Sequence, residues 1–169
     1  GNADAQYHLG LMYAHGRGVT QSYTDAAHWY QLAAKQGDAY AQTNLGILYL
    51  EGQGVSQSDK EALNWLKLAA EQGSSIAQPN LGKMYLDGQG VEHSDQQAYE
   101  LFLKAAQQGA ALGQYNLGAL SYQGNPLTGQ SYITAARWFQ LAADQNFAMA
   151  QYNLGVMYHA GEGFKQSDS

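Results

Sequence analysis

The feature that most constrains the fold of this 169-residue chain is a 15-residue block that occurs five times. The block reads AQYHLGLMYAHGRGV from residue 5, and related blocks begin at residues 41, 77, 113 and 150, so the starts lie 36, 36, 36 and 37 residues apart. A second block, typified by AAHWYQLAAKQG, stands between successive copies of the first. Self-similarity at a fixed period of about 20–50 residues is typical of architectures in which each unit packs on its neighbours.

Both blocks carry the signals of α-helices. In the second block Ala26, Tyr30 and Ala33 recur at the spacing of one helix face. A serine suited to cap the first turn precedes every copy of this block, at Ser22, Ser58, Ser94 and Ser131. A residue that tolerates the left-handed conformation follows every copy, at Gly37, Gly73, Gly109 and Asn146. The first block is expected to start near Asp4 and to end at Gly16, with equivalent ends in the other copies. Each repeat is therefore predicted to be two helices joined by a short loop.

Two recurring groups of glycines occupy unusual positions in the repeat. Gly10 and its equivalents lie in the middle of a predicted helix, where each costs up to about 1 kcal/mol relative to alanine. We interpret it as a site of close helix approach, with Ala33 and Ala34 opposite and Trp29 filling the space beside them. The following Gly-x-Gly lies after a helix and lacks the Lys-Ser/Thr of a phosphate loop, so it predicts a helix end and a tight turn, not a nucleotide site.

The repeated pattern A-Q-x-x-L-G-x-x-Y-x-x-G-x-G-V, followed by A-x-x-W-x-x-x-A-A-x-x-G, resembles the Sel1-like repeat. The resemblance implies an all-α fold, a right-handed αα-superhelix of about four and a half 36-residue helix-turn-helix repeats. It predicts a single solenoid domain over residues 1–169, with repeats at about 5–40, 41–76, 77–112 and 113–149 and a partial repeat at 150–169. We expect the chain to be a segment of a longer protein, with uncapped ends that allow self-association. The fourth repeat has Pro126 and one extra residue before Ser131, so its inter-helix loop should follow a different path.

Composition excludes several functional classes. The formal net charge of −6 provides no basic surface for nucleic acid. No apolar run is long enough to insert into a membrane, and the absence of cysteine excludes disulfides and thiolate metal sites. His8 and His15 lie seven residues apart without a third ligand nearby, so no metal site and no cofactor are predicted. Glu51 and Asp87 end neighbouring helices but suggest no enclosed acid–base pair, and we predict no catalytic residue.

Positions that differ between repeats, on one face of the first helix, are the candidates for function. Tyr7, Leu11 and Ala14 form such a stripe, one residue away from the recurring Asn44 position, which we interpret as bonding between repeats. In tetratricopeptide-like solenoids the matching face lines a concave groove that binds peptides. The resemblance therefore implies a partner-binding groove formed by Tyr7, Leu11, Ile47, Leu50, Lys83, Leu86, Tyr115, Tyr122, Tyr152 and Val156.

The resemblance implies a protein-interaction scaffold or adaptor, not an enzyme, that binds a peptide or helix of a protein partner in this groove. Two alternatives remain open at the level of sequence. One is an enzyme of the β-lactam-binding or β-lactam-hydrolysing type found among cysteine-rich relatives, although this chain has no cysteine. The other is a structural spacer whose groove binds nothing. The compartment stays open, with a bacterial extracytoplasmic location favoured over a cytoplasmic one.

Overall fold

The computed structural model describes residues 1–164 of the chain. Within this range the chain forms nine α-helices and no β-strand, which confirms the predicted all-α class. The helices are α1 (Ala3–His15), α2 (Tyr23–Lys35), α3 (Ala39–Glu51), α4 (Asp59–Glu71), α5 (Ala77–Asp87), α6 (Asp95–Gln107), α7 (Ala111–Gln123), α8 (Tyr132–Ala143) and α9 (Ala148–Ala160).

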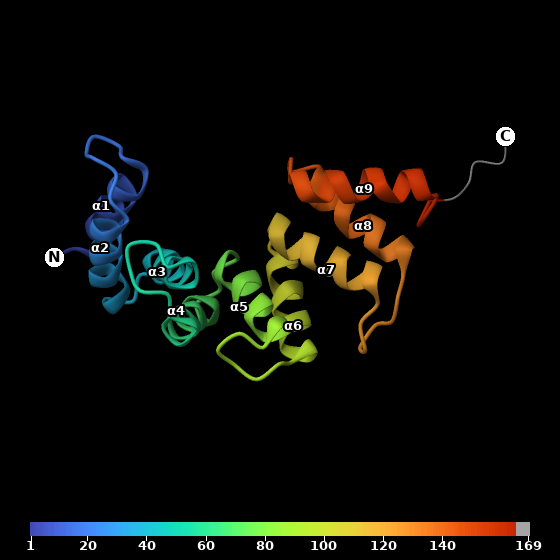
Figure 1. Ribbon diagram of the computed structural model, residues 1–169, viewed down its shortest axis with the longest axis horizontal. Helices are drawn as coiled ribbons and strands as arrows, with labels where there is room; N and C mark the ends of the chain where they lie inside the picture. Colours follow the sequence, from blue (N-terminus) through green and yellow to red (C-terminus); the bar gives the residue numbers. More distant parts are fainter. Residues whose placement is uncertain (165–169) are drawn as a thin grey trace.

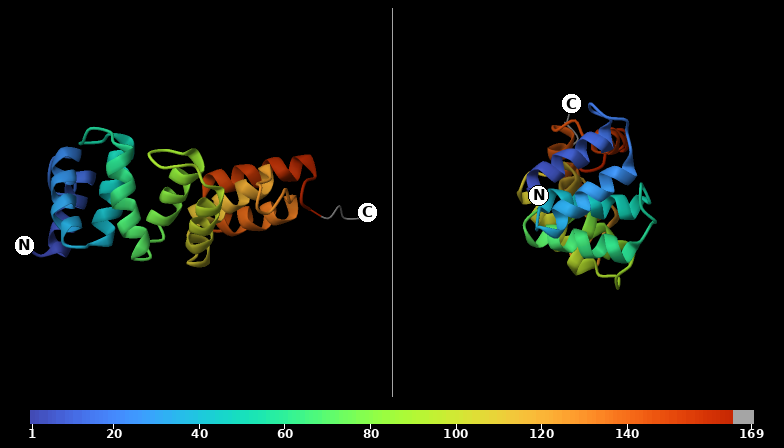
Figure 2. Two further views of the ribbon diagram at one scale, coloured as in Figure 1. Left: turned by 90° about the horizontal axis from the view of Figure 1, so that it is seen from below. Right: turned by 90° about the vertical axis from the view of Figure 1, so that its left-hand side faces the viewer.

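The helices stack in chain order into an elongated solenoid (Figure 1). Each helix packs against the next one along the chain, and α1 and α9 lie at opposite ends of the long axis (Figure 2). We call α1, α3, α5, α7 and α9 the A helices and α2, α4, α6 and α8 the B helices. The buried side chains of the described residues form four successive clusters, each of which spans two repeats, as expected where one helical hairpin cannot bury its own apolar face.

The helix ends follow the predicted capping pattern. The Ser58 hydroxyl accepts a hydrogen bond from the Glu61 backbone N–H at the start of α4, and the equivalent serines do the same at the other B helices. The A helix α3 ends at Gly52, which adopts the left-handed conformation at φ 67°. These local interactions satisfy backbone groups that have no partner inside the helix, which is why single residues mark the boundaries so clearly.

The mid-helix glycines allow close approach of the two helices within a repeat, but the partner is not the predicted one. A Cβ at Gly46 would lie 2.7 Å from Cγ of Leu66, and one at Gly82 would lie 2.7 Å from the Phe102 ring. The residue against the glycine is therefore the one that follows the tryptophan position, and the expectation for Ala33, Ala34 and Trp29 was wrong. The tryptophan position packs elsewhere, because Trp65 lies against the buried cluster that spans the first two repeats.

A ladder of glutamine bonds runs along the solenoid, and each bond joins the two helices of one repeat. The side-chain amide of Gln108, at the end of α6, donates to the Oε1 of the buried Gln78 in α5 at 2.9 Å. The same bond recurs one repeat earlier between Gln72 and Gln42 at 2.8 Å. Buried amides are costly unless they are paired, so these bonds favour one arrangement of the two helices within each repeat over others.

The fourth inter-helix loop differs from the others, as predicted. Gly124 adopts φ 81° and ψ 133° instead of the left-handed helical conformation that ends the other A helices. The loop then forms an isolated antiparallel bridge between Asn125 and Gly129. Pro126 and the extra residue of this repeat account for the change, because they cannot follow the path of the Gly-x-Gly loop.

Candidate interaction groove

The A helices carry the variable stripe along one surface of the solenoid. Successive A helices also contact each other directly, at α1 with α3 and at α5 with α7. Residues of the stripe therefore face residues of the next repeat across short inter-helix clefts. Two of these clefts open into cavities, one near each end of the described part of the chain.

The first cavity, of about 260 Å³, lies between α1 and α3. The predicted groove residues Tyr7, Leu11 and Ile47 all line it. The other residues that line it are Ala14, His15, Tyr30, Asn44, Leu48, Glu51 and Gln53. Three of the predicted residues are thus brought together, with the carboxylate of Glu51 at the same cavity.

The second cavity, of about 350 Å³, lies between α7 and α9. The predicted groove residues Tyr115, Tyr122, Tyr152 and Val156 line it together. The remaining lining residues are Ala119, Gln123, Phe139, Asn153 and Met157. Because the repeat period relates Tyr115 to Tyr7 and Val156 to Ile47, the two cavities are built from equivalent positions of different repeats.

Each cavity contains an alanine where other repeats have a larger side chain. Ala14 in α1 is equivalent to Leu50 in α3, and Ala119 in α7 is equivalent to Leu11 in α1. Both alanines line their cavity. A short side chain leaves unfilled space between two helix backbones whose separation is set elsewhere, which gives a physical reason for openings at these two places.

The predicted residues of the central repeats are arranged differently. Leu50 and Leu86 are half-buried. Leu50 packs against the hydrophobic cluster that spans the second and third repeats, and Leu86 packs against the one that spans the third and fourth. Lys83 is exposed, and its Nζ lies 2.7 Å from a carboxylate oxygen of Asp87, one helical turn away in α5. These three residues share the A-helix surface but line neither of the two cavities.

Tyrosine hydroxyls give both cavities a polar component. Tyr30 is 2% exposed, and this burial raises its pKa to about 12, while the side chain of Asn44 opposes the shift. At the other cavity, interaction with the neighbouring Glu162 carboxylate raises the pKa of Tyr122. Both tyrosines therefore stay protonated at neutral pH and present O–H donors beside aromatic surface.

Sequence reasoning missed part of this arrangement. Asn44 and Asn153 were placed off the groove face, yet they line the two cavities. The interpretation of this position as bonding between repeats fits Asn44, whose side chain is near enough to Tyr7 and Tyr30 of the preceding repeat to oppose the rise in their pKa. It does not hold for Asn80, whose amide donates to the Ile76 carbonyl of its own repeat at 2.7 Å. The recurrence of asparagine indicated that this position is constrained, but it did not indicate which residues the side chain interacts with.

The B-helix residues Tyr30 and Phe139 were also missed as cavity residues. Each lies opposite a mid-helix glycine and its ring reaches the cavity. The available signal was the large side chain that recurs directly after the tryptophan position in all four second blocks.

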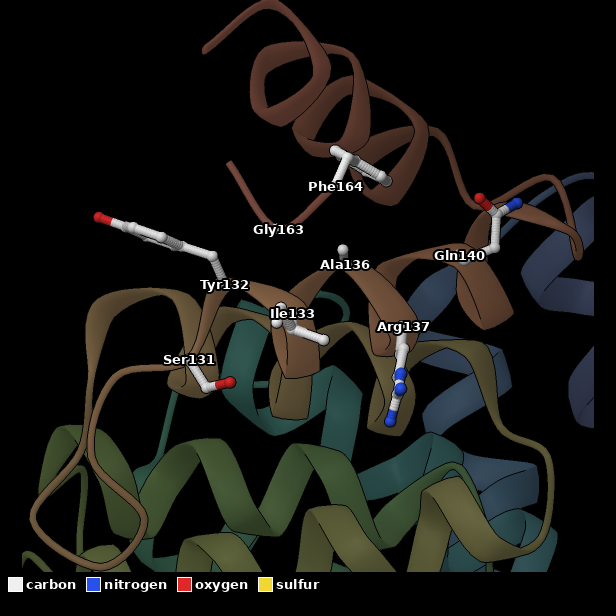
Figure 3. A pocket seen from close by; sticks show the side chains of 8 residues that line it. All are labelled: Ser131, Tyr132, Ile133, Ala136, Arg137, Gln140, Gly163 and Phe164. Carbon is white, nitrogen blue, oxygen red and sulfur yellow. The ribbon is translucent and has the colours of Figure 1, made fainter. Parts of the chain in front are cut away.

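A third cavity, of about 790 Å³, lies between α8 and the segment that follows α9. Figure 3 shows Phe164 and Gly163 on the α9 side, across from Ala136 and Ile133 of α8, while Arg137 extends away from Phe164. This cavity borders the last of the described residues. None of the predicted groove residues lines it.

Two other kinds of site are absent from the described part of the chain. Across residues 1–164 no group of three or more histidine, aspartate or glutamate side chains is placed to hold a metal ion. No helix in the same range is long and apolar enough to cross a membrane.

Comparison with protein families identifies the repeated unit. The family model of the Sel1 repeat matches residues 3–38, 39–74, 75–109, 111–147 and 148–169. No curated protein sequence matches the chain.

Several solved structures share the fold over nearly the whole chain. A protective antigen present in uropathogenic Escherichia coli strains, displaying an SLR fold, is 37% identical over 98% of this chain with a TM-score of 0.84. A Sel1 repeat protein from Oxalobacter formigenes is 31% identical over 98% with a TM-score of 0.87. A putative Sel1 repeat protein from Klebsiella pneumoniae is 26% identical over 97% with a TM-score of 0.70. The chain spans 35%, 66% and 79% of the lengths of these proteins, respectively.

Proposed function

Because the chain belongs to the Sel1 repeat family, whose repeats generally mediate protein–protein interactions, we propose that it is a scaffold that binds a partner peptide along its A helices. The proposed groove follows the inner side of the solenoid. Direct contact of α1 with α3 and of α5 with α7 supports this placement, because the helices on the inner side of a curved stack lie closest together.

One observation carries the proposal. Positions that vary between repeats come together at two open cavities. Most positions that recur, in contrast, are used for helix packing, helix capping and the glutamine ladder. Seven of the ten predicted groove residues line one or other cavity. Concave, largely apolar surface with a few polar groups is typical of binding sites, and tyrosine is enriched among residues that dominate binding energy.

The ligand that fits this surface is an extended segment or a helix. It would place its side chains into the clefts between the A helices. Peptide-binding solenoids gain affinity from apolar side chains in such pockets and gain specificity from polar groups around them. Tyr115 and Tyr122 supply both kinds of contact at the α7/α9 cavity, since each combines a ring with a hydroxyl.

The test is selection of peptides from a phage-displayed library of random dodecamers on the immobilised chain. We expect specific peptides to be enriched, and we expect the double variant Tyr115→Ala/Tyr122→Ala to bind them at least tenfold more weakly. The matched control, Leu68→Ala/Leu141→Ala, removes two exposed apolar side chains from B helices and should leave the affinity unchanged. Circular dichroism checks that both variants keep their helical content.

Two results would contradict the proposal. One is the absence of any enriched peptide in repeated selections. The other is a set of peptides whose binding is lost in the B-helix control variant but retained in the tyrosine variant, which would move the interaction to the opposite side of the solenoid.

A further inference from the structure

The two cavities are equivalent in position and similar in chemistry, and each also has a carboxylate beside it. Their volumes, about 260 and 350 Å³, lie near or below the lower end of the ~300–1,000 Å³ typical of small-molecule sites. Each is therefore suited to a single large side chain, not to a whole ligand. Their linings of tyrosine, phenylalanine and aliphatic carbon favour an aromatic or large aliphatic side chain.

At the α1/α3 cavity the carboxylate is that of Glu51. It lines the cavity, is exposed to solvent, and makes no ion pair within residues 1–164. A cation brought beside the cavity by a ligand would therefore meet an unneutralised carboxylate without displacing an existing partner.

At the α7/α9 cavity the carboxylate is that of Glu162. It lies close enough to the hydroxyl of Tyr122, a residue that lines the cavity, to raise the pKa of that tyrosine. Its second oxygen, Oε2, is buried and has no hydrogen-bond partner in the described part of the chain. A buried carboxylate oxygen without a donor is energetically costly, and a donor supplied by a ligand would relieve that cost.

The A helices offer almost no positive charge to balance these groups. Among the lysines and arginines, Lys83 alone falls within an A helix of the described chain, and it is already paired with Asp87. The whole chain carries a formal net charge of −6. Complementary charge steers association and selects between partners, so this surface favours a cationic ligand over an anionic one.

From these observations we infer that the partner segment is basic, and that each cavity receives a large apolar side chain that is next to an arginine or lysine in the partner. The apolar side chain fills the space left by Ala14 or Ala119, and the adjacent cation lies against Glu51 or Glu162. This inference rests on the proposed function, because it specifies the ligand of the same groove.

The same random dodecamer library tests it through the composition of the selected peptides. We expect enrichment of aromatic or large aliphatic residues directly next to arginine or lysine, relative to the unselected library. Enriched peptides without this basic preference, or with acidic residues beside the apolar one, would overturn the inference while leaving the proposed groove intact. A failure to enrich any peptide would overturn both.

Variants that fill the cavities test the position of the apolar side chain. Ala14→Leu introduces the residue found in the second and third repeats, and Ala119→Leu introduces the residue found in the first. The double variant should keep its helical content and bind the most enriched synthetic peptide at least tenfold more weakly, because burial of one large apolar side chain contributes about that much or more. Unchanged affinity in this variant would overturn the inference.

A charge-neutral variant tests the position of the cation. Glu51→Gln should weaken the same peptide by about two- to fivefold, the range expected for a solvent-exposed ion pair. Glu71→Gln, which neutralises another exposed acid at a helix C-terminus, is the matched control and should bind like the wild type. Equal affinities of the two variants would overturn the assignment of the cation to Glu51.

A second copy of the chain is the competing occupant of the cavities. Sedimentation of the chain without peptide distinguishes this case. Self-association that is weakened by Ala14→Leu/Ala119→Leu would assign the cavities to a chain–chain contact and would overturn the inference, whereas a monomer, or an oligomer insensitive to this variant, supports it.

Discussion

Replacing Gly118 by alanine should destabilise the chain, whereas the same change at Gly155 should stabilise it. Both glycines occupy the same mid-helix position of the repeat, so alanine raises the intrinsic helix propensity equally, by up to about 1 kcal/mol. The surroundings differ. A Cβ at Gly118 would lie 2.6 Å and 2.7 Å from two ring carbons of Phe139, whereas no heavy atom lies within 4 Å of a Cβ at Gly155 among the described residues.

The magnitude follows from the overlap. The distance of 2.6 Å is roughly 0.8 Å closer than the 3.4 Å at which ordinary contacts begin, so the Phe139 ring, which is 1% exposed, has to shift from its packed position to admit the methyl group. Overpacking of this kind costs about 1–3 kcal/mol. Because the propensity gain is common to both variants, the difference between their free energies of unfolding should equal the overpacking cost, about 1–3 kcal/mol.

Urea denaturation followed by circular dichroism measures this difference, with thermal unfolding as a second measurement. For a chain of this length 1 kcal/mol corresponds to about 2–4 °C in Tm, so the variants should be separated by at least about 2 °C. If both alanine variants are stabilised to the same extent, the argument that the glycine exists for close helix approach is refuted.

Three further outcomes follow from the geometry. Gln108→Ala should lower the free energy of unfolding by about 1–3 kcal/mol, because it leaves the buried Gln78 amide oxygen without its donor; a loss below about 0.5 kcal/mol in urea denaturation would contradict a structural role for the ladder. Ser58→Ala should cost about 1 kcal/mol through loss of the N-cap of α4, whereas Ser58→Asn should retain most of the stability in the same assay. The free energy of unfolding should fall between pH 10 and about 12, because Tyr30 ionises near its ordinary pKa of 10.0 when unfolded but only near a pKa of about 12 when folded. Tyr30→Phe should reduce this fall. An identical pH profile of the variant and the wild type would argue against the burial of this hydroxyl.

The fold was largely predictable because the features that specify it are local and repeated. The capping hydroxyl of Ser58 acts on an N–H three residues away, and Gly52 ends its helix through its own backbone conformation. The glutamine ladder was equally accessible from sequence, since both partners, such as Gln78 and Gln108, recur in phase with the repeats. Recurrence alone does not show which glutamine pairs with which, because the two partners lie 30 residues apart on different helices.

The candidate site was predictable only as a surface. Comparison of repeats identified the variable stripe, but Tyr7 and Leu50 occupy that stripe with different surroundings: Tyr7 lines a cavity, and Leu50 packs against a hydrophobic cluster. Which clefts stay open depends on side-chain volumes across two helices at once, as at Ala119. The contact between Tyr122 and Glu162 joins residues of different repeats through a loop, and no local pattern encodes it.

Amide NMR spectra of the chain, titrated with the most enriched synthetic peptide, test the central claim most directly. The account predicts that the largest chemical-shift changes occur in α1, α3, α7 and α9, at and around the residues that line the two cavities, such as Ala14 and Ala119. Changes concentrated on the exposed faces of α2, α4, α6 and α8, with the A helices unaffected, would contradict it.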